Sequence, residues 1–356
     1  MKIGIIGLPN SGKTTIFNAL TRSKAEVSAY GGAKVEPNRA VVAVNDERVD
    51  RISSLFKPKK KIYGTIELID FVGLSEGFAK AGGFSASAMA LMRNTDALAL
   101  VVSNFPDPLL GRPQPQGDME KMNEEILLSD LIIAEGRMEK ILLGFKRGQK
   151  TPELERELRV LSTIHDQLNQ GRPIRDLALG EDDMKVIRGF QFLTLKSSLV
   201  VLNSHEETFG KNQSILDEMG RNGAVIEFAG SFEMELSQLD DDEEVQLFME
   251  DMGIAESARD RLTRAAFEML GYISFFTIGS DEVRAWSIRK GSTALEAAGL
   301  VHTDMARGFI RAECFSFEDL MACGSEKGIR EKGLFRLEGK DYIVKDGDIL
   351  SIRFNV

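Results

Sequence analysis

The N-terminal stretch constrains the fold of this chain more than any other part of it. Residues 1–7 (MKIGIIG) are typical of a short buried strand. Residues 7–14 (GLPNSGKT) match the phosphate-binding pattern G-x-x-x-x-G-K-[ST] at every fixed position, and the apolar residues 15–20 predict a helix. Strand, glycine-rich loop and helix in this order indicate a P-loop that binds a nucleoside triphosphate. The alternative is a chance match in an ordinary strand–helix turn.

The residue types in this loop suit a triphosphate. Glycines let backbone N–H groups converge on phosphate oxygens, and the start of the helix adds partial positive charge. We expect Lys13 to act in catalysis by reaching the β- and γ-phosphates, and the Thr14 hydroxyl to ligate Mg²⁺. The residues expected to bind nucleotide here are Pro9, Asn10, Ser11, Gly12, Lys13, Thr14 and Thr15.

A second pattern lies downstream of the P-loop. Residues 62–70 predict a strand that ends on Asp70, and Gly73 follows three residues later. In this context we expect Asp70 to hold Mg²⁺ through water and the Gly73 N–H to sense the γ-phosphate. Leu74 stands where many GTPases have a glutamine that orients water, so hydrolysis without a partner should be slow.

The rest of the chain predicts an interrupted sheet. Residues 97–102, 197–203 and 224–228 read as further buried strands. Between the first two of these, residues 118–147 and 152–169 repeat apolar side chains every three or four positions, which predicts an antiparallel helical hairpin. The fold class is therefore α/β: a P-loop domain with a mostly parallel sheet, an inserted hairpin, and a small α+β unit after it.

The length of 356 residues favours two or three domains rather than one core. We expect a nucleotide-binding domain over 1–103 and 193–273, an inserted helical domain over 104–192 and a C-terminal domain over 274–356. A basic run at 57–61 is interpreted as a solvated loop.

Composition limits the partners and the compartment. The net charge of −10 argues against a globally basic nucleic-acid binder, so we expect no DNA specificity. No apolar run approaches the roughly 20 residues of a membrane span. The two cysteines, Cys314 and Cys323, lack metal-ligand spacing. We expect a reduced cytoplasmic protein that does not contact membrane.

The order of these motifs resembles the YchF subfamily of Obg-like ATPases, which are TRAFAC-class P-loop proteins. The stretches that carry the resemblance are 7–14 (GLPNSGKT), 35–38 (VEPN), 203–206 (NSHE), 283–286 (VRAW), 302–304 (HTD), 308–312 (GFIRA) and 338–348 (EGKDYIVKDGD). The resemblance covers essentially the whole chain. It implies a C-terminal TGS-like domain of β-grasp type, slow Mg²⁺-dependent hydrolysis of ATP, with GTP as a second substrate, and an association with the ribosome or another translation-related partner.

The base preference is predicted from residues 203–206. In G proteins an Asn-Lys-x-Asp motif follows this strand, and its aspartate accepts hydrogen bonds from guanine. The longer carboxylate of Glu206 would not meet guanine in the same place, whereas Asn203 suits the N6 and N7 edge of adenine. The alternative is that Asn203 caps a loop and Glu206 is solvated. Ser204 and the segment Ala229, Gly230 and Ser231 complete the expected nucleotide contacts.

Two residues leave the catalytic mechanism open. Lys34 replaces the threonine that closes the first switch on Mg²⁺ in the family that the chain resembles. It either neutralises the γ-phosphate as an internal finger or is a solvated loop lysine. Asn10 either ligates a K⁺ ion that assists hydrolysis or simply forms the turn after Pro9.

Three functions are compatible with these motifs. The first is a slow ATPase that switches an interaction with the ribosome, using the helical and TGS-like domains as contact surfaces. The second is a nucleotide-gated scaffold that barely hydrolyses. The third, a small-molecule kinase, requires an acceptor site for which no residues are identified.

Overall fold

The computed structural model describes residues 1–23, 37–71, 86–106, 111–239 and 242–355. Lys34, Gly73 and Leu74, which carry predictions above, lie outside these residues. The chain divides into two compact units, one formed by residues 1–41 and 67–261 and the other by residues 42–66 and 262–356.

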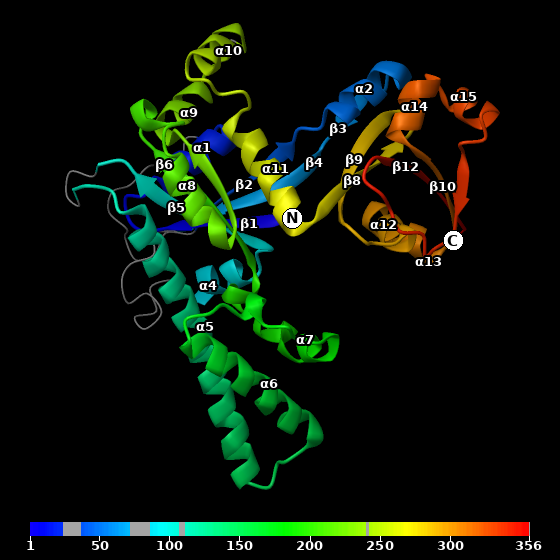
Figure 1. Ribbon diagram of the computed structural model, residues 1–356. Helices are drawn as coiled ribbons and strands as arrows, with labels where there is room; N and C mark the ends of the chain where they lie inside the picture. The colour runs from blue at the N-terminus through cyan, green and yellow to red at the C-terminus, as the bar shows by residue number, and fades with distance from the viewer. Residues whose placement is uncertain (24–36, 72–85, 107–110, 240–241, 356) are drawn as a thin grey trace. The chain divides into compact units, whose positions relative to one another are not determined.

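The first unit contains a six-stranded sheet in the order β2-β4-β1-β5-β6-β7 (Figure 1). Its strands are β1 (Lys2–Gly7), β2 (Asn38–Val44), β4 (Gly64–Asp70), β5 (Ala97–Asn104), β6 (Ser197–Ser204) and β7 (Ala224–Phe228). From β4 to β7 every neighbouring pair is parallel. The α/β fold with a mostly parallel sheet is therefore confirmed, and the carboxyl ends of these strands meet at one edge.

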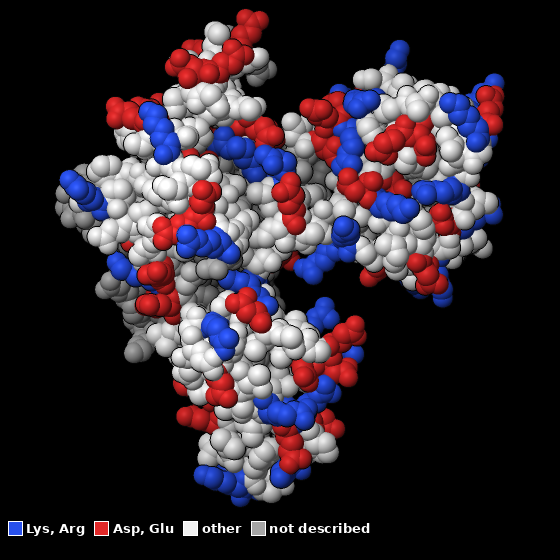
Figure 2. All heavy atoms as spheres, viewed as in Figure 1, with Lys and Arg blue, Asp and Glu red and all other residues white. Residues whose placement is uncertain are grey.

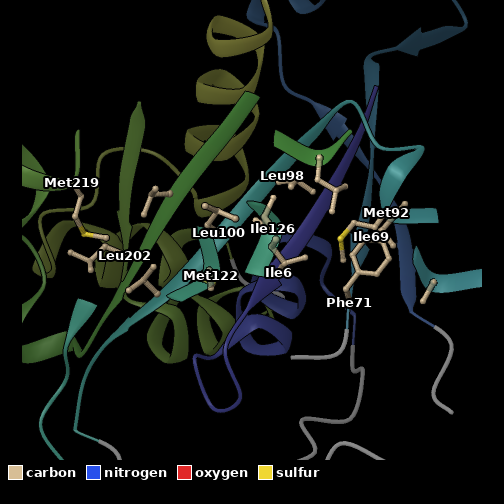
Figure 3. Close-up of a cluster of buried hydrophobic side chains, with 14 residues drawn as sticks. Ile6, Ile69, Phe71, Met92, Leu98, Leu100, Met122, Ile126, Leu202 and Met219 are labelled. Carbon is tan, nitrogen blue, oxygen red and sulfur yellow. The ribbon is translucent and has the colours of Figure 1, made fainter. Parts of the chain in front are cut away.

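The helices of this unit surround the sheet and form the hairpin. They are α1 (Lys13–Thr21), α4 (Ala86–Arg93), α5 (Pro115–Lys146), α6 (Pro152–Asn169), α7 (Glu181–Ile187), α8 (Gln213–Met219), α9 (Gly230–Leu236) and α10 (Asp242–Asp251), and α11 (Ala258–Leu270) begins in this unit and continues into the second. The start of α5 packs on the sheet: Met122 and Ile126 lie against Ile6, Leu100 and Leu202 in one buried cluster (Figure 3). This contact anchors the hairpin to the nucleotide-binding part of the chain.

The predicted hairpin is present as α5 and α6. Thr151 caps α6 by accepting a hydrogen bond from Leu154 N, and Pro152 occupies the first helical position. Arg137 of α5 and Glu157 of α6 form a bidentate ion pair, with both N–O distances below 3 Å. The two helices bury a shared apolar core made of Ala134, Ile141, Val160, Leu161, Ile164 and Leu168. In Figure 2 the visible face of the hairpin shows basic and acidic side chains interspersed.

One buried carboxylate ties the hairpin to the sheet. Asp130 of α5 has no exposed surface and accepts hydrogen bonds from the backbone N–H groups of Leu193 and Thr194 and from the Thr194 hydroxyl. Arg93, at the end of α4, donates to the same carboxylate at 2.9 Å. Two polypeptide segments far apart in sequence therefore converge on one charge.

The second unit contains another six-stranded sheet, in the order β11-β10-β12-β8-β9-β3. Its strands are β3 (Lys60–Ile62), β8 (Tyr272–Ile278), β9 (Glu282–Arg289), β10 (Phe309–Ser316), β11 (Arg336–Glu338) and β12 (Asp348–Phe354), and its helices are α2 (Glu47–Phe56), α12 (Ala294–Val301), α13 (Thr303–Arg307), α14 (Phe317–Cys323) and α15 (Glu326–Glu331). The interpretation of the basic run as a loop is wrong at its end, because Lys60 and Lys61 belong to β3 and pair with β9. Val49 and Ile52 of α2 pack with Phe276 in the core of this unit.

The structure describes both cysteines and most of the chain's helices. Cys314 is buried, Cys323 is half-buried, and both are free thiols. In the described segments, no helix combines the length and the apolar character needed to cross a membrane.

We predict that Asp130→Ala lowers the free energy of unfolding of the chain by about 3–5 kcal/mol, because it leaves Arg93 without its counter-charge and two buried N–H groups without their acceptor. Urea denaturation measures this change. Asp182→Ala is the matched control, since it removes an exposed carboxylate of α7 that pairs with Lys185 on the surface, and should have little effect. Equal stabilities of the two variants would contradict this role of Asp130.

Candidate nucleotide-binding site

The loop between β1 and α1 requires glycine at both of its ends. A Cβ on Gly7 would lie 2.5 Å from Val101 O and 2.6 Å from Ser11 Oγ. Gly12 has a φ of +84°, a conformation that other residues rarely adopt, and its Cβ would lie 2.2 Å from Asn203 Nδ2. Glycine at these two positions therefore lets the loop pack directly against Val101 of β5 and against Asn203, where a side chain would collide, and this allows the tight strand–helix turn that a P-loop requires.

Lys13 is the buried cation of this loop. It is the first residue of α1, its exposed fraction is 8 %, and its Nζ donates to Leu8 O at 3.0 Å. Burial lowers the pKa of its ammonium group, and the negative charge of Asp70 offsets part of this effect. Phosphate oxygens would supply negative charge that stabilises the charged form of this buried ammonium group.

Asp70, Thr14 and Asn38 meet beside the start of α1. The Thr14 hydroxyl donates to Asp70 Oδ2 at 2.9 Å, and Asn38 Nδ2 donates to the same oxygen at 3.3 Å. Burial raises the pKa of Asp70, although both hydrogen bonds act in the opposite direction. The other carboxylate oxygen, Oδ1, is buried without a hydrogen-bond partner among the described residues.

These groups fit Mg²⁺. Magnesium prefers carboxylate and hydroxyl oxygens and keeps several waters, so one carboxylate and one hydroxyl beside a phosphate site are a suitable set. The unpartnered Oδ1 of Asp70 is a buried acceptor that a cation or its water would satisfy. The residues present are therefore the kind that bind a magnesium-coordinated triphosphate.

Asn203, the last but one residue of β6, joins the P-loop to the start of α9. Its Nδ2 donates to Ser11 O at 3.0 Å, and its Oδ1 accepts from Gly230 N at 3.0 Å. The side chain is buried, and a Cβ on Gly230 would lie 2.5 Å from Oδ1. The amide thus fixes the spacing of two loops that the sequence places about 220 residues apart.

Ser204 and Glu206 have different surroundings. The Ser204 hydroxyl donates to Glu227 Oε1 at 2.6 Å and accepts from Asn104 and Asn212, so it is committed to bonds within the protein. Glu206 begins a short 3₁₀ helix, Glu206–Thr208, and is exposed. The structure therefore leaves Glu206 accessible to solvent or ligand, whereas the Ser204 hydroxyl acts as a support for the loop that follows β6.

The segment Ala229–Ser231 is held by a buried ion pair. Glu233 accepts from Ala229 N at 3.0 Å, and Arg261 of α11 donates to both of its carboxylate oxygens at 2.6 and 2.7 Å. Burial raises the pKa of Glu233, and the charge and hydrogen bonds of Arg261 oppose this shift. The Arg261 guanidinium also lies 4.8 Å from the centre of the Phe228 ring.

The structure brings most of the expected residues to one edge of the sheet. The P-loop residues, Asp70, Asn203 and the 229–231 segment lie together there, while Pro9, Asn10 and Ser231 are exposed. Sequence reasoning missed several supporting residues, namely Asn38, Asn104, Glu227, Glu233 and Arg261. Asn38 could have been identified from the sequence, because it is the last residue of the VEPN stretch. The others reach the site only through tertiary contacts.

Comparison with known proteins gives a consistent picture. A family model named YchF-GTPase_C, described as a protein of unknown function (DUF933), matches residues 272–355, and a model described as a 50S ribosome-binding GTPase matches residues 2–135. Two proteins named "Ribosome-binding ATPase YchF" are similar over their whole length. The one from Haemophilus ducreyi is 38 % identical, covering 100 % of this chain and 99 % of the relative, and the one from Bacillus subtilis is 37 % identical, covering 99 % of each.

A solved structure agrees with these matches. The YchF GTPase of Schizosaccharomyces pombe superimposes with a TM-score of 0.83 at 29 % sequence identity, covering 99 % of this chain and 97 % of that one. The similarity therefore includes both compact units and the hairpin between β5 and β6.

We predict that Asn203→Ala weakens nucleotide binding at least tenfold, because Ser11 O and Gly230 N both lose their partner and the two loops are no longer held at a fixed spacing. The same variant should lose about 1–3 kcal/mol of stability. Calorimetric titration with Mg²⁺-nucleotide and urea denaturation measure the two effects. Asn169→Ala, on the exposed end of α6, is the control. An unchanged affinity in Asn203→Ala would remove this residue from the site.

Proposed function

This chain belongs to the YchF family, and on that premise we propose that it binds ATP with Mg²⁺, hydrolyses it slowly and uses the nucleotide to control binding to the ribosome. The main support is the full-length similarity to proteins named as ribosome-binding ATPases, together with the grouping of Lys13, Thr14 and Asp70 beside the glycine-rich loop. A ribosomal partner would place the protein in the cytoplasm.

The proposed nucleotide site uses the P-loop and Asp70. Backbone N–H groups of residues 10–15 and the Lys13 ammonium would bind the phosphates, and Thr14 and Asp70 would hold Mg²⁺. The metal would neutralise charge on the phosphate oxygens when bound. The raised pKa of Asp70 supports this assignment, since a buried carboxylate without a full set of partners is stabilised by a cation.

ATP is the proposed substrate, with GTP as the weaker one. The names of similar proteins include both ATPase and GTPase, so the preference rests on this chain's own residues. Each atom of the Asn203 amide uses one hydrogen bond within the protein and keeps capacity for another, which suits the donor and acceptor edge of adenine. Glu206 stands where guanine recognition requires a shorter aspartate.

We therefore expect direct titration of the full chain to show tighter binding of Mg²⁺-ATP than of Mg²⁺-GTP. Lys13→Ala should weaken both, because it removes the buried cation of the cradle. A strong preference for GTP would refute the adenine assignment, and an unchanged affinity in Lys13→Ala would refute the phosphate site itself.

Hydrolysis is proposed to depend on a partner, because Leu74 can neither orient nor polarise water. Asn10 has a φ of +61°, a turn conformation that asparagine tolerates, and its side chain is exposed within the P-loop. It remains a proposed ligand for K⁺. Lys34 remains a proposed γ-phosphate contact, with a solvated lysine as its alternative.

Single-turnover release of γ-phosphate tests the switch. We predict slow release from the isolated protein and faster release with ribosomes, since a partner would supply the missing water-orienting group. Replacing KCl with NaCl should slow the reaction if Asn10 holds K⁺, and equal rates would exclude that role. Nucleotide-dependent cosedimentation with ribosomes without any release would instead favour the scaffold.

The three-domain division also stays a proposal. The helical segment 104–192 and the C-terminal 274–356 are the proposed contact surfaces for the ribosome. Residues 42–66 pack with the C-terminal part of the chain, so we propose that this part folds stably only in their presence.

A further inference from the structure

A cleft of about 520 Å³ lies in the first unit, where the base of the hairpin meets the sheet. Leu98 and Leu100 of β5 and Ile126 of α5 form its apolar floor, and Figure 3 shows these three side chains within the buried cluster. The volume falls within the range of pockets that bind small molecules.

The lining of the cleft contains none of the residues assigned to the phosphate cradle. Leu98 pairs with Ser198 near the first residues of β5 and β6, and both residues line the cleft. The P-loop instead follows Gly7, which pairs with Val101 further along β5. Because the strands are parallel, the cleft lies toward their amino ends and the cradle lies at their carboxyl ends.

The rim of the cleft is basic. Arg172, Arg175, Lys196 and Arg221 line it, together with one carboxylate, Asp176. In the described part of the chain, none of the three arginines forms an ion pair with a carboxylate. Several like charges around a hollow repel one another and concentrate anions there, although the chain as a whole has a net charge of −10.

The structure fixes two of these cations in place. Lys196 Nζ donates to the backbone oxygens of Arg93 at 2.8 Å and Thr95 at 2.5 Å, and one guanidinium nitrogen of Arg175 donates to Lys196 O at 3.3 Å. Burial lowers the pKa of Lys196. Both hydrogen bonds of its ammonium go to neutral carbonyl groups, and the negative charges of Asp96 and Asp130 offset only part of the effect of burial, so an anion would add favourable counter-charge.

We propose that this cleft binds a small phosphorylated molecule with a flat apolar body, of the size of a nucleoside monophosphate. Guanidinium groups match phosphate oxygens in a bidentate geometry, so Arg172, Arg175 and Arg221 would hold the phosphate. The body would lie on Leu127 and Pro173, apolar lining side chains that keep part of their surface exposed. The 5′-phosphorylated end of an RNA carries the same chemistry as the free molecule, and neither source depends on the ATPase function proposed above.

The test uses the full-length protein with its P-loop saturated by Mg²⁺ and a non-hydrolysable ATP analogue. Adenosine 5′-monophosphate is the probe, titrated by calorimetry beside inorganic phosphate and adenosine. We expect saturable one-to-one binding of the monophosphate, tighter than binding of either fragment. Arg172→Ala/Arg175→Ala should weaken it at least tenfold and leave the affinity for the ATP analogue unchanged.

The matched control is Arg147→Ala/Arg159→Ala, which removes two exposed arginines of the hairpin outside the cleft and should change nothing. Absence of saturable monophosphate binding, or equal binding by both double variants, would overturn the proposal. A 5′-phosphorylated dinucleotide that competes with the monophosphate would identify an RNA end as a source. If only longer RNA binds, with a steep salt dependence and no competition by the monophosphate, the cleft is part of an RNA surface and the proposal is wrong.

Discussion

The geometry of the nucleotide site depends on the amide of Asn203. It links Ser11 O in the P-loop to Gly230 N at the start of α9. A Cβ on Gly12 or Gly230 would collide with this amide, at 2.2 and 2.5 Å respectively. The buried Asn203 side chain of β6 therefore explains why two distant loops contain glycine. It also holds these two loops together at one edge of the sheet.

A second constraint is the burial of opposite charges beside that edge. Burial lowers the pKa of Lys13 and raises the pKa of Asp70, because each group has lost part of the hydration that stabilises its charged form. The attraction between the two charges offsets only part of each pKa shift. A magnesium-bound triphosphate would carry both counter-charges, because its phosphates would meet Lys13 and the metal would meet Asp70. The proposed site would therefore bind metal and nucleotide together.

Sequence alone was sufficient where the signal is local. The P-loop pattern and the spacing of apolar residues in α5 and α6 depend on neighbours within a few positions. The short strand β3 was missed because two exposed lysines fill it and only pairing with β9 makes it a strand. Glu227 and Arg261 were missed for the same reason, since each reaches the site through contacts between distant segments. The basic cleft likewise requires residues from three segments to converge.

Arg93 connects the rim of the cleft to the buried Asp130 of the hairpin. Arg93 binds the carboxylate of Asp130 through its guanidinium, and its backbone oxygen accepts from Lys196 Nζ on the rim of the cleft. A phosphate that attracted Lys196 would compete with this carbonyl and alter the support of α4 against α5. Such coupling is reciprocal. If phosphate in the cleft changed the affinity of the hairpin for a partner, that partner would change the affinity of the cleft for phosphate by the same factor. Lys196 directly precedes β6, which carries Asn203 near its carboxyl end and pairs with β5 along its whole length.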